Sequence, residues 1–380
     1  MRPFTPKQRM LNAYRGLPND RPAVAPEFWC YYPAKVLGVD MLEFRKVPFH
    51  LALKATFEKF GCEGWGCIGC GVPKPEVKSH SERHAIGPDT FESRCRVETP
   101  FGMLTRAERL NREEPGWTVE RWMKDLDRDL PAFEYLTFGG DPEQAQVGSA
   151  MAAWKEVGES YLLECALGST FFDWFAEGRQ GGFEAAVFDF AEREEQLRGL
   201  QARYSDYLRR LVRALCRKTP FESFFVGCSW SCNSLLGPRL WRQWDKPVLQ
   251  AVCDEVHRRG RLLHVHVHGK CLETVADLAE LGVDCVCPFE RPPGGDVAGL
   301  AGLKTVARLL AGRTTMNGNI HTVETLIRGQ PADARREVGE VLEAFAGNAR
   351  VIVGTGDQVG RETPEENLRA MIEAARAGAV

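Results

Sequence analysis

Short apolar runs alternate with long amphipathic segments through the last two thirds of the chain, and this alternation limits the fold more than any other feature. Six runs have the length of buried strands: 161–166, 221–226, 262–268, 283–288, 314–318 and 351–353. Helical patterns such as 191–215, 237–259 and 333–346 separate them. Strands and helices that alternate in this way predict βαβ units and a parallel sheet.

Two earlier apolar runs, 22–28 and 60–67, bring the count to about eight strands, which favours a closed barrel over an open sheet. Segments 76–83 and 90–99 alternate polar and apolar residues instead, and a Pro-Phe-Gly turn then leads into 103–109. This pattern is typical of an antiparallel hairpin. We therefore expect an α/β chain with a single (β/α)₈ TIM-type barrel domain over 1–380, and a hairpin inserted at about 70–110.

Composition excludes several classes of protein. Hydrophobic residues make up 44% of the chain and charged residues 27%, as in ordinary folded proteins. Lysine and arginine number 49 against 52 acids, so the basic excess of a nucleic-acid binder is missing. No run approaches the ~18 apolar residues that a membrane span needs, and the N-terminus has no apolar signal core. The 13 scattered cysteines indicate reduced thiols. We expect a cytoplasmic enzyme, monomeric or homodimeric, that binds neither nucleic acid nor membrane.

Three histidines alternate along the run 262–268. Side chains alternate across a strand, so His264, His266 and His268 point to one face. Buried imidazole nitrogens need partners, and a metal ion supplies them well. His266 and His268 approach the strand end just before Gly269 and are predicted to bind a metal. His264 lies one layer deeper, where a hydrogen bond would satisfy it.

Barrel active sites lie at the C-terminal ends of the strands, where two acids and two amides occur. Asp357 follows the run 351–353 in a Gly-Thr-Gly-Asp turn, and Glu290 follows the run 283–288. We predict Asp357, Glu290 and Asn319 as catalytic residues, although each acid could instead cap a helix. Asn233 and Asn319 are placed to orient a substrate oxygen or a ligand.

Aromatic side chains near the strand ends are candidates for the lining of a substrate pocket. We predict Trp29, Tyr31, Phe172 and Trp230, together with the amide Asn233, as substrate-binding residues. The segment 170–175 also fits another interpretation, a helix that packs through its aromatic face.

A second group of metal-ligand residue types lies within the predicted hairpin. Cys67 and Cys70 precede His80 and His84 by a gap of nine residues, and Cys62 lies close by. That gap is shorter than is usual for a structural zinc site. The alternating pattern favours a hairpin, and a structural zinc site stays open as the alternative.

These motifs, in this order, resemble the uroporphyrinogen decarboxylase-like superfamily over nearly the whole chain. The matching segments are 9–16, Asp20-Arg21-Pro22, 237–241, the histidine strand with Gly269, 318–320, the Gly-Thr-Gly-Asp turn and 363–367. The resemblance implies a single (β/α)₈ barrel and one of two activities. One is metal-free decarboxylation of uroporphyrinogen, and the other is zinc-dependent methyl transfer that involves a corrinoid protein.

The resemblance favours the methyltransferase branch. The decarboxylase's arginine-rich substrate motif is missing, and the segment 25–33 stands in its place. The methyltransferases carry a His-Cys-Cys ligand set, and by position these ligands fall on His266, His268 and Asp357. Both replacements are good zinc ligands. The resemblance therefore implies a zinc site formed by these three residues.

The altered ligand set bears on the substrate. Two thiolates cancel the charge of zinc, whereas a His-His-Asp set leaves about +1, a harder Lewis acid that suits polarisation of oxygen. We expect a small O-methylated methyl donor, such as an aromatic methoxy compound, and a corrinoid on a partner protein as acceptor. Three alternatives stay open. They are a metal-independent decarboxylase of a small carboxylate or porphyrinogen-like substrate, a 2-His-1-carboxylate metal enzyme of another type, and a barrel that serves as a binding scaffold.

Overall fold

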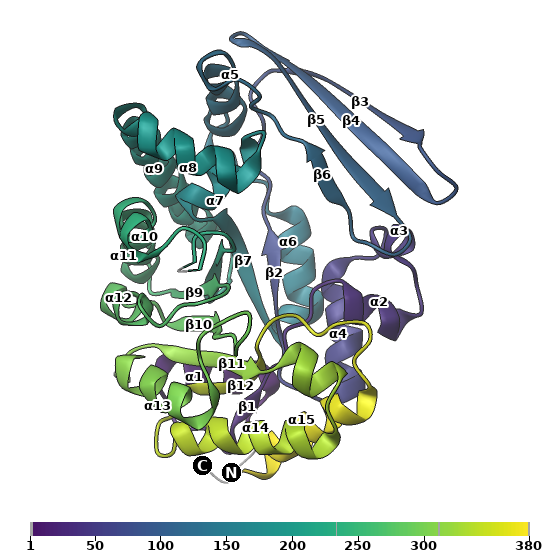
Figure 1. Cartoon of the computed structure of the whole chain (residues 1–380), viewed down its shortest axis with the longest axis vertical. Helices are drawn as coiled ribbons and strands as arrows, with labels where there is room; N and C mark the ends of the chain where they lie inside the picture. The colour runs from purple at the N-terminus through teal and green to yellow at the C-terminus, as the bar shows by residue number, and fades with distance from the viewer. Residues whose placement is uncertain (1–2, 233, 311, 379–380) are drawn as a thin grey trace.

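A curled parallel sheet of eight strands forms the centre of the protein (Figure 1). The computed structural model describes residues 3–232, 234–310 and 312–378. Along the sheet the strands are β1 (Ala23–Val24), β12 (Val351–Thr355), β11 (Thr315–Ile320), β10 (Cys285–Pro288), β9 (Leu262–Val267), β8 (Ser223–Cys228), β7 (Leu162–Ser169) and β2 (Trp65–Gly69). All eight lie within or beside the runs expected from the sequence, so the predicted barrel class is confirmed.

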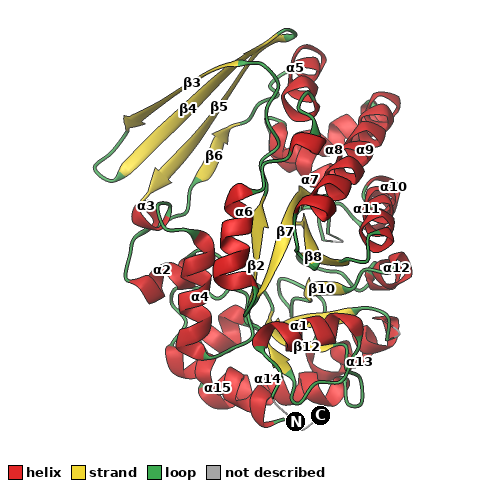
Figure 2. Ribbon diagram, turned by 180° about the vertical axis from the view of Figure 1, so that it is seen from behind, coloured by secondary structure: helices red, strands yellow, loops and turns green. Residues whose placement is uncertain are grey.

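Helices cover the outside of this sheet (Figure 2). Those before and within the first half of the barrel are α1 (Pro6–Arg15), α2 (Tyr31–Leu37), α3 (Met41–Phe44), α4 (Phe49–Phe60), α5 (Leu126–Phe138), α6 (Gly148–Ala153), α7 (Phe171–Gly178), α8 (Gly182–Glu192) and α9 (Glu194–Lys218). The later ones are α10 (Pro238–Trp244), α11 (Lys246–Arg258), α12 (Val275–Leu281), α13 (Gly299–Leu310), α14 (Pro331–Ala344) and α15 (Glu365–Ala377). One short 3₁₀ helix, η1 (Pro142–Gln144), and two short π-helices, η2 (Trp154–Gly158) and η3 (Thr322–Ile327), complete the set.

Glu63 connects the two end strands of the sheet. Its backbone N–H donates to the carbonyl of Val24 at 2.9 Å, and its carboxylate accepts from the backbone N–H of Val24 at 2.9 Å. The same buried carboxylate pairs with Arg9 and Arg21. A fully buried carboxylate is stable only when it is paired and hydrogen-bonded in this way. The seam between β1 and the start of β2 is therefore held by one side chain.

The lower end of the barrel is filled by side chains. Tyr14 of α1 is fully buried, and its hydroxyl lies 3.1 Å from Nδ1 of His264. The same Nδ1 lies 2.8 Å from the carboxylate of Glu164, which is also fully buried. Trp65 and Phe225 pack edge-on against the His264 ring. His264 thus belongs to a deep hydrogen-bonded layer, as its register suggested.

A four-stranded antiparallel sheet is inserted between β2 and β7. Its strands lie in the order β3 (Lys78–Ala85), β4 (Thr90–Thr99), β5 (Gly102–Asn111) and β6 (Trp117–Glu120). The predicted antiparallel insertion is confirmed, and the short strand β6 extends it beyond residue 110. In Figure 2 this sheet projects away from the barrel, whereas β2 and β7 themselves pair from Trp65 opposite Leu162 onward.

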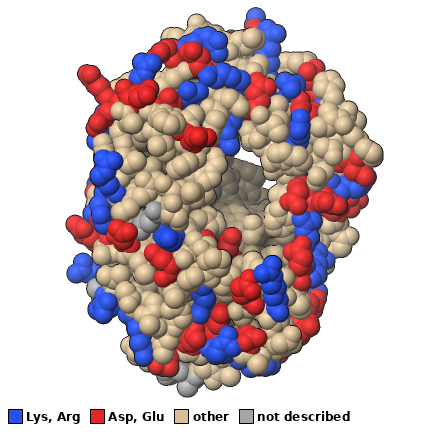
Figure 3. Space-filling view, in the orientation of Figure 1, with Lys and Arg blue, Asp and Glu red and all other residues tan. Residues whose placement is uncertain are grey.

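The charge on the molecular surface and the apolarity of the helices bear on the expected partners. Figure 3 shows a deep hollow near the centre of one face, and basic and acidic side chains are mixed over that face. In the part of the chain that the structure describes, no helix combines the length and apolarity that crossing a bilayer requires.

Candidate metal centre

Two histidines at the end of β9 point into the barrel mouth, as the strand alternation predicted. Nε2 of His266 lies 2.8 Å from Nε2 of His268. Glu290, which follows β10, accepts from Nδ1 of His268 and from the backbone N–H of Gly269, both at 2.8 Å. His268 is thereby fixed against the rim, and His266 lies deeper and is buried.

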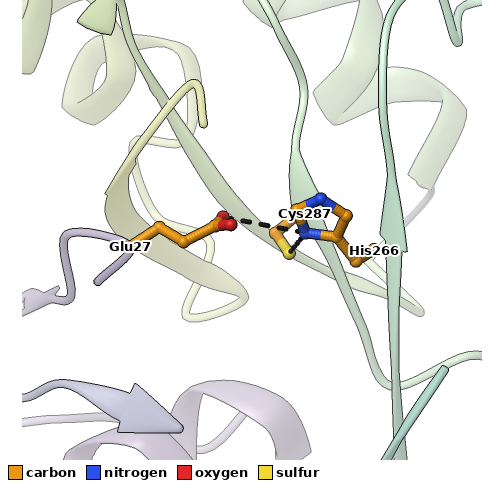
Figure 4. A group of neighbouring side chains, drawn as sticks. All are labelled: Glu27, His266 and Cys287. Carbon is orange, nitrogen blue, oxygen red and sulfur yellow. Dashed lines mark hydrogen bonds and ion pairs between the residues drawn. The ribbon is translucent and has the colours of Figure 1, made fainter. Parts of the chain in front are cut away.

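Glu27 and Cys287 lie on the other side of the His266 ring (Figure 4). Nδ1 of His266 is 3.1 Å from the sulfur of Cys287 and 3.7 Å from Oε2 of Glu27. One ligand atom from each of the three residues lies within 4.8 Å of the others, and all three residues are buried. Among the described residues this is the group with metal-ligand geometry.

The backbone accounts for the position of each ligand atom. Cys287 of β10 is the register partner of His266 on β9, so adjacent parallel strands set their separation. Glu27 follows β1, and its backbone N–H donates to the hydroxyl of Thr355 in β12 at 2.9 Å. The indole N–H of Trp29 donates to Oε1 of Glu27. Oε2 of Glu27 is buried and has no hydrogen-bond partner in the structure.

Burial shifts the protonation of all three groups. It raises the pKa of Glu27 to about 8, and the nearby charge of Asp357 adds to that shift. Burial also lowers the pKa of His266, which is therefore a neutral imidazole, and raises the pKa of the Cys287 thiol. Neutral imidazole is the form that binds metals, and a cation would displace the protons of the other two groups. An unpartnered buried carboxylate oxygen beside imidazole and thiol fits a zinc ion.

The rim next to this group carries ionisable side chains whose pKa values are shifted. Burial opposes protonation of His268, yet the hydrogen bond to Glu290 and the nearby acids raise its pKa to about 9. Burial raises the pKa of Asp357, although His268 opposes this shift. Glu290 and Asp357 line a cavity of about 240 Å³ together with His321 and Glu324. The two acids therefore line the mouth from the ends of β10 and β12, which lie on either side of β11.

The predicted ligand set and the observed group share only one residue. The sequence pointed to His266, His268 and Asp357, whereas the group with ligand spacing consists of Glu27, His266 and Cys287. His268 still touches His266, and Asp357 accepts from the backbone N–H of Gln358. The sequence placed Cys287 in the run 283–288 and Glu27 in the run 22–28, but the register that brings Cys287 opposite His266 appears only in the structure.

Asn319 and Phe172 lie away from the roles expected of them. The Asn319 amide is fully buried and donates to the carbonyl of Phe289 at 3.0 Å, so it supports the loop that carries Glu290. Phe172 is also fully buried and packs edge-on against Phe183 and Phe190. The structure thus corresponds to the alternative interpretation of segment 170–175, a helix that packs through its aromatic face.

The other predicted pocket residues are spread around the mouth. Trp29 lies at the site, bound to Glu27 and stacked on Phe49. Tyr31 donates to Glu114 in the inserted sheet, beneath the guanidinium of Arg361. Trp230 follows β8 and lies beneath Arg121. Asn233 lies outside the described residues.

The cysteines and histidines of the alternative zinc site do not come together. His80 and His84 are exposed on β3, whereas Cys62 is buried before β2. Cys67 belongs to β2, and Cys70 follows it with its sulfur 3.6 Å from that of Cys165. The antiparallel sheet carries the histidines away from the barrel, which removes the basis for a structural zinc site here.

A family model and one solved structure agree with this fold. The family model described as uroporphyrinogen decarboxylase (URO-D) matches residues 176–378, more than half of the chain. The solved structure of a methyltransferase from Methanosarcina mazei is 17% identical, with a TM-score of 0.66 and coverage of 98% of each chain. A type I 3-dehydroquinate dehydratase from Clostridium difficile is 8% identical over 61% of this chain and 76% of its own, with a TM-score of 0.29. No curated protein matches the chain.

Proposed function

The chain belongs to the uroporphyrinogen decarboxylase family, and from that premise we propose that it is a zinc-dependent methyltransferase. It would move a methyl group from a small O-methylated compound to a corrinoid carried by a partner protein. The shared fold with the Methanosarcina mazei methyltransferase supports this branch of the family. The observation that carries the proposal is the buried group of Glu27, His266 and Cys287 at the barrel mouth.

These three residues offer the donor atoms that zinc prefers. Carboxylate oxygen, imidazole nitrogen and thiolate sulfur are its usual protein ligands, and Glu27, His266 and Cys287 supply one of each. Bound there, zinc would supply a Lewis acid for the oxygen that carries the methyl group. Glu27 and Cys287 would each lose a proton, so the formal charge of the site would be about 0 rather than the +1 of a His-His-Asp set.

The charge of the metal ligands therefore gives no reason to prefer an oxygen-linked methyl donor. The preference for such a donor rests on His268. The pKa of His268 is about 9, so it is protonated at neutral pH, and Glu290 holds it beside His266. When the methyl group leaves, its former oxygen gains negative charge and needs a proton. His268 lies where it would hold that proton, and Trp29 would form part of the wall against the substrate.

Charge at the mouth disfavours the decarboxylase alternative with a porphyrinogen. Glu290 and Asp357 line the mouth, and acids there do not favour a substrate with many carboxylates. Arg291, which follows Glu290 in the chain, is engaged by Glu337 and Glu340. Recognition of a polyanion would need several free arginines at this place.

The test is methylation of added cob(I)alamin by a panel of methoxylated compounds. The spectral change from cobalt(I) to methyl-cobalt(III) is the readout. Zinc-loaded protein should catalyse the transfer, and chelator-treated protein or Glu27→Gln should lose it. Release of CO₂ from a carboxylate substrate by metal-free protein, without methyl transfer from any donor, would favour the decarboxylase instead.

A further inference from the structure

Arg121 stands where the inserted sheet meets the barrel mouth. It follows β6, and its guanidinium lies over the ring of Trp230, 5.3 Å from the ring centroid. Nη1 of Arg121 donates to the backbone carbonyl of Glu177 at 2.9 Å. Trp230 belongs to the loop after β8, the strand next to the one that carries His266.

Arg121 differs from the other arginines that cover aromatic rings. Four such arginines each form an ion pair with a carboxylate: Arg106 with Glu108, Arg198 with Glu194, Arg361 with Glu114, and Arg369 with Glu365. Arg121 forms none with any acid in the described parts of the chain. Burial also lowers the pKa of Arg121. The charge of Glu177 acts on Arg121 without an ion-pair contact, so a bound anion would still recover part of the free energy that burial of this cation costs.

A cavity of about 310 Å³ opens beside this guanidinium. Its lining includes Thr118, Arg121, Gln180, Phe183 and Trp230. The side chains therefore combine one cation, two polar groups and two aromatic rings. The accessible lining is mainly polar, which suits a charged group of a ligand better than an apolar one.

The Trp230 wall is held in place from below. Asp173 of α7 is buried, and its carboxylate accepts the backbone N–H groups of Ser229, Trp230 and Ser231. The bonds to Trp230 and Ser231 measure 3.0 and 2.8 Å. Three donors on one carboxylate fix the loop, so the ring that faces Arg121 belongs to a preformed wall.

We propose that the cavity between Arg121 and Trp230 is an anion subsite that binds the carboxylate of the small-molecule methyl donor. Guanidinium and carboxylate pair through two parallel N–H donors, and Nε and Nη2 of Arg121 are available for this. The inference rests on the proposed function only in naming the ligand as the donor.

Binding tests the subsite without turnover. Full-length protein is titrated with benzoate and with benzyl alcohol, which share a ring and differ in charge, and calorimetry gives each Kd. Wild-type protein should bind benzoate at least about tenfold more tightly, the size expected of a charged hydrogen-bonded pair. Arg121→Gln should remove this preference, and Arg121→Lys should restore part of it.

Arg106→Gln is the matched control, because Arg106 also covers a tryptophan but already has Glu108 as its partner. It should leave the preference for benzoate unchanged. Equal affinities for the two ligands in wild-type protein, or an equal loss in Arg106→Gln, would overturn the subsite. The subsite would also be overturned by an Arg121→Gln variant that binds benzoate normally and differs from wild type only in how its methyl transfer depends on a corrinoid protein.

A kinetic arm separates this inference from the proposed function. Methoxybenzoate and methoxybenzene are compared as methyl donors, and Arg121→Gln should raise KM for the anionic donor alone with little change in kcat. Methyl transfer with equal KM for both donors in wild-type protein and variant overturns the subsite and leaves the methyltransferase. Charge-selective binding that depends on Arg121, without methyl transfer from any donor, supports the subsite and overturns the methyltransferase.

Discussion

Nδ1 of His266 lies 3.1 Å from the sulfur of Cys287, and the two residues occupy paired positions on neighbouring parallel strands. Hydrogen bonds of the sheet therefore set the distance between imidazole and thiol. Ligands on rigid strands are oriented before an ion arrives, which favours tight binding and a defined geometry. Glu27 joins them from β1 through its backbone bond to Thr355 of β12.

Zinc content should depend on Cys287 and not on its neighbour Cys285. Both cysteines are buried on β10, two residues apart and on the same face, but only Cys287 approaches His266. After dialysis, wild-type protein and Cys285→Ser should retain roughly one zinc per chain, and Cys287→Ser should lose most of it. Elemental analysis provides the measurement. Equal zinc loss from both variants would contradict the assignment.

The choice between the two ligand sets can be tested directly. Glu27→Gln should weaken zinc binding by more than about tenfold, because it removes a charged ligand. His268→Ala and Asp357→Asn should retain zinc, and His268→Ala should lose methyl transfer. Competition with a fluorescent chelator measures the affinities. If His268→Ala and Asp357→Asn release zinc and Glu27→Gln retains it, the set predicted from the sequence is the correct one.

Asp245 should make the protein less stable as the pH rises. Burial, with a contribution from Asp173, raises the pKa of Asp245 from 3.8 to about 8. Between these values the folded state keeps a proton that the unfolded chain releases, so the free energy of unfolding falls as the pH rises towards 8. Asp245→Asn should remove a pH dependence on the order of a few kcal/mol.

Urea unfolding at pH 5 and pH 8, with chelator present throughout, measures this effect. Asp254→Asn on the exposed face of α11 is the control and should behave as wild type. The assignment is wrong if Asp245→Asn keeps the full difference between the two pH values.

Glu63 should contribute more to the free energy of unfolding than its position at a strand edge suggests. Its buried carboxylate meets Arg9, Arg21 and the backbone N–H of Val24. Glu63→Gln leaves two arginines without their shared partner and should lower the free energy of unfolding by about 3–5 kcal/mol. Exposed Glu58→Gln on α4 should change it by less than about 0.5 kcal/mol. Thermal unfolding monitored by circular dichroism measures the effect. Equal melting temperatures for the two variants would contradict the prediction.

Local patterns in the sequence were sufficient for most of the fold. Most barrel strands are short apolar runs, and their length and neighbours identify them without knowledge of distant contacts. The short strand β6 was missed because its four residues, Trp117–Glu120, are too few for a period to stand out from the surrounding loop. His266 and His268 were found for the same local reason, since two residues of separation place them on one face of a strand.

The rest of the site depends on contacts between distant parts of the chain. Glu27 meets His266 only because β1 lies beside β12 in the curled sheet, and Cys287 meets it only through the register of β9 and β10. Neither relationship is visible in a local window of sequence. The family resemblance, which is now confirmed, directed attention instead to His268 and Asp357. Phe172 was misplaced because an aromatic run after a strand fits both a pocket and a helix core.

The antiparallel sheet leaves the barrel after β2 and returns at β7, and these two strands are direct neighbours in register. An excursion that starts and ends at adjacent strands can be lengthened, shortened or exchanged without altering a single barrel hydrogen bond. Arg121 lies on this excursion, whereas Glu27, His266 and Cys287 lie at the ends of barrel strands. Under the proposed anion subsite, the residue that selects a compound and the residues that act on it therefore lie on separable pieces of the chain.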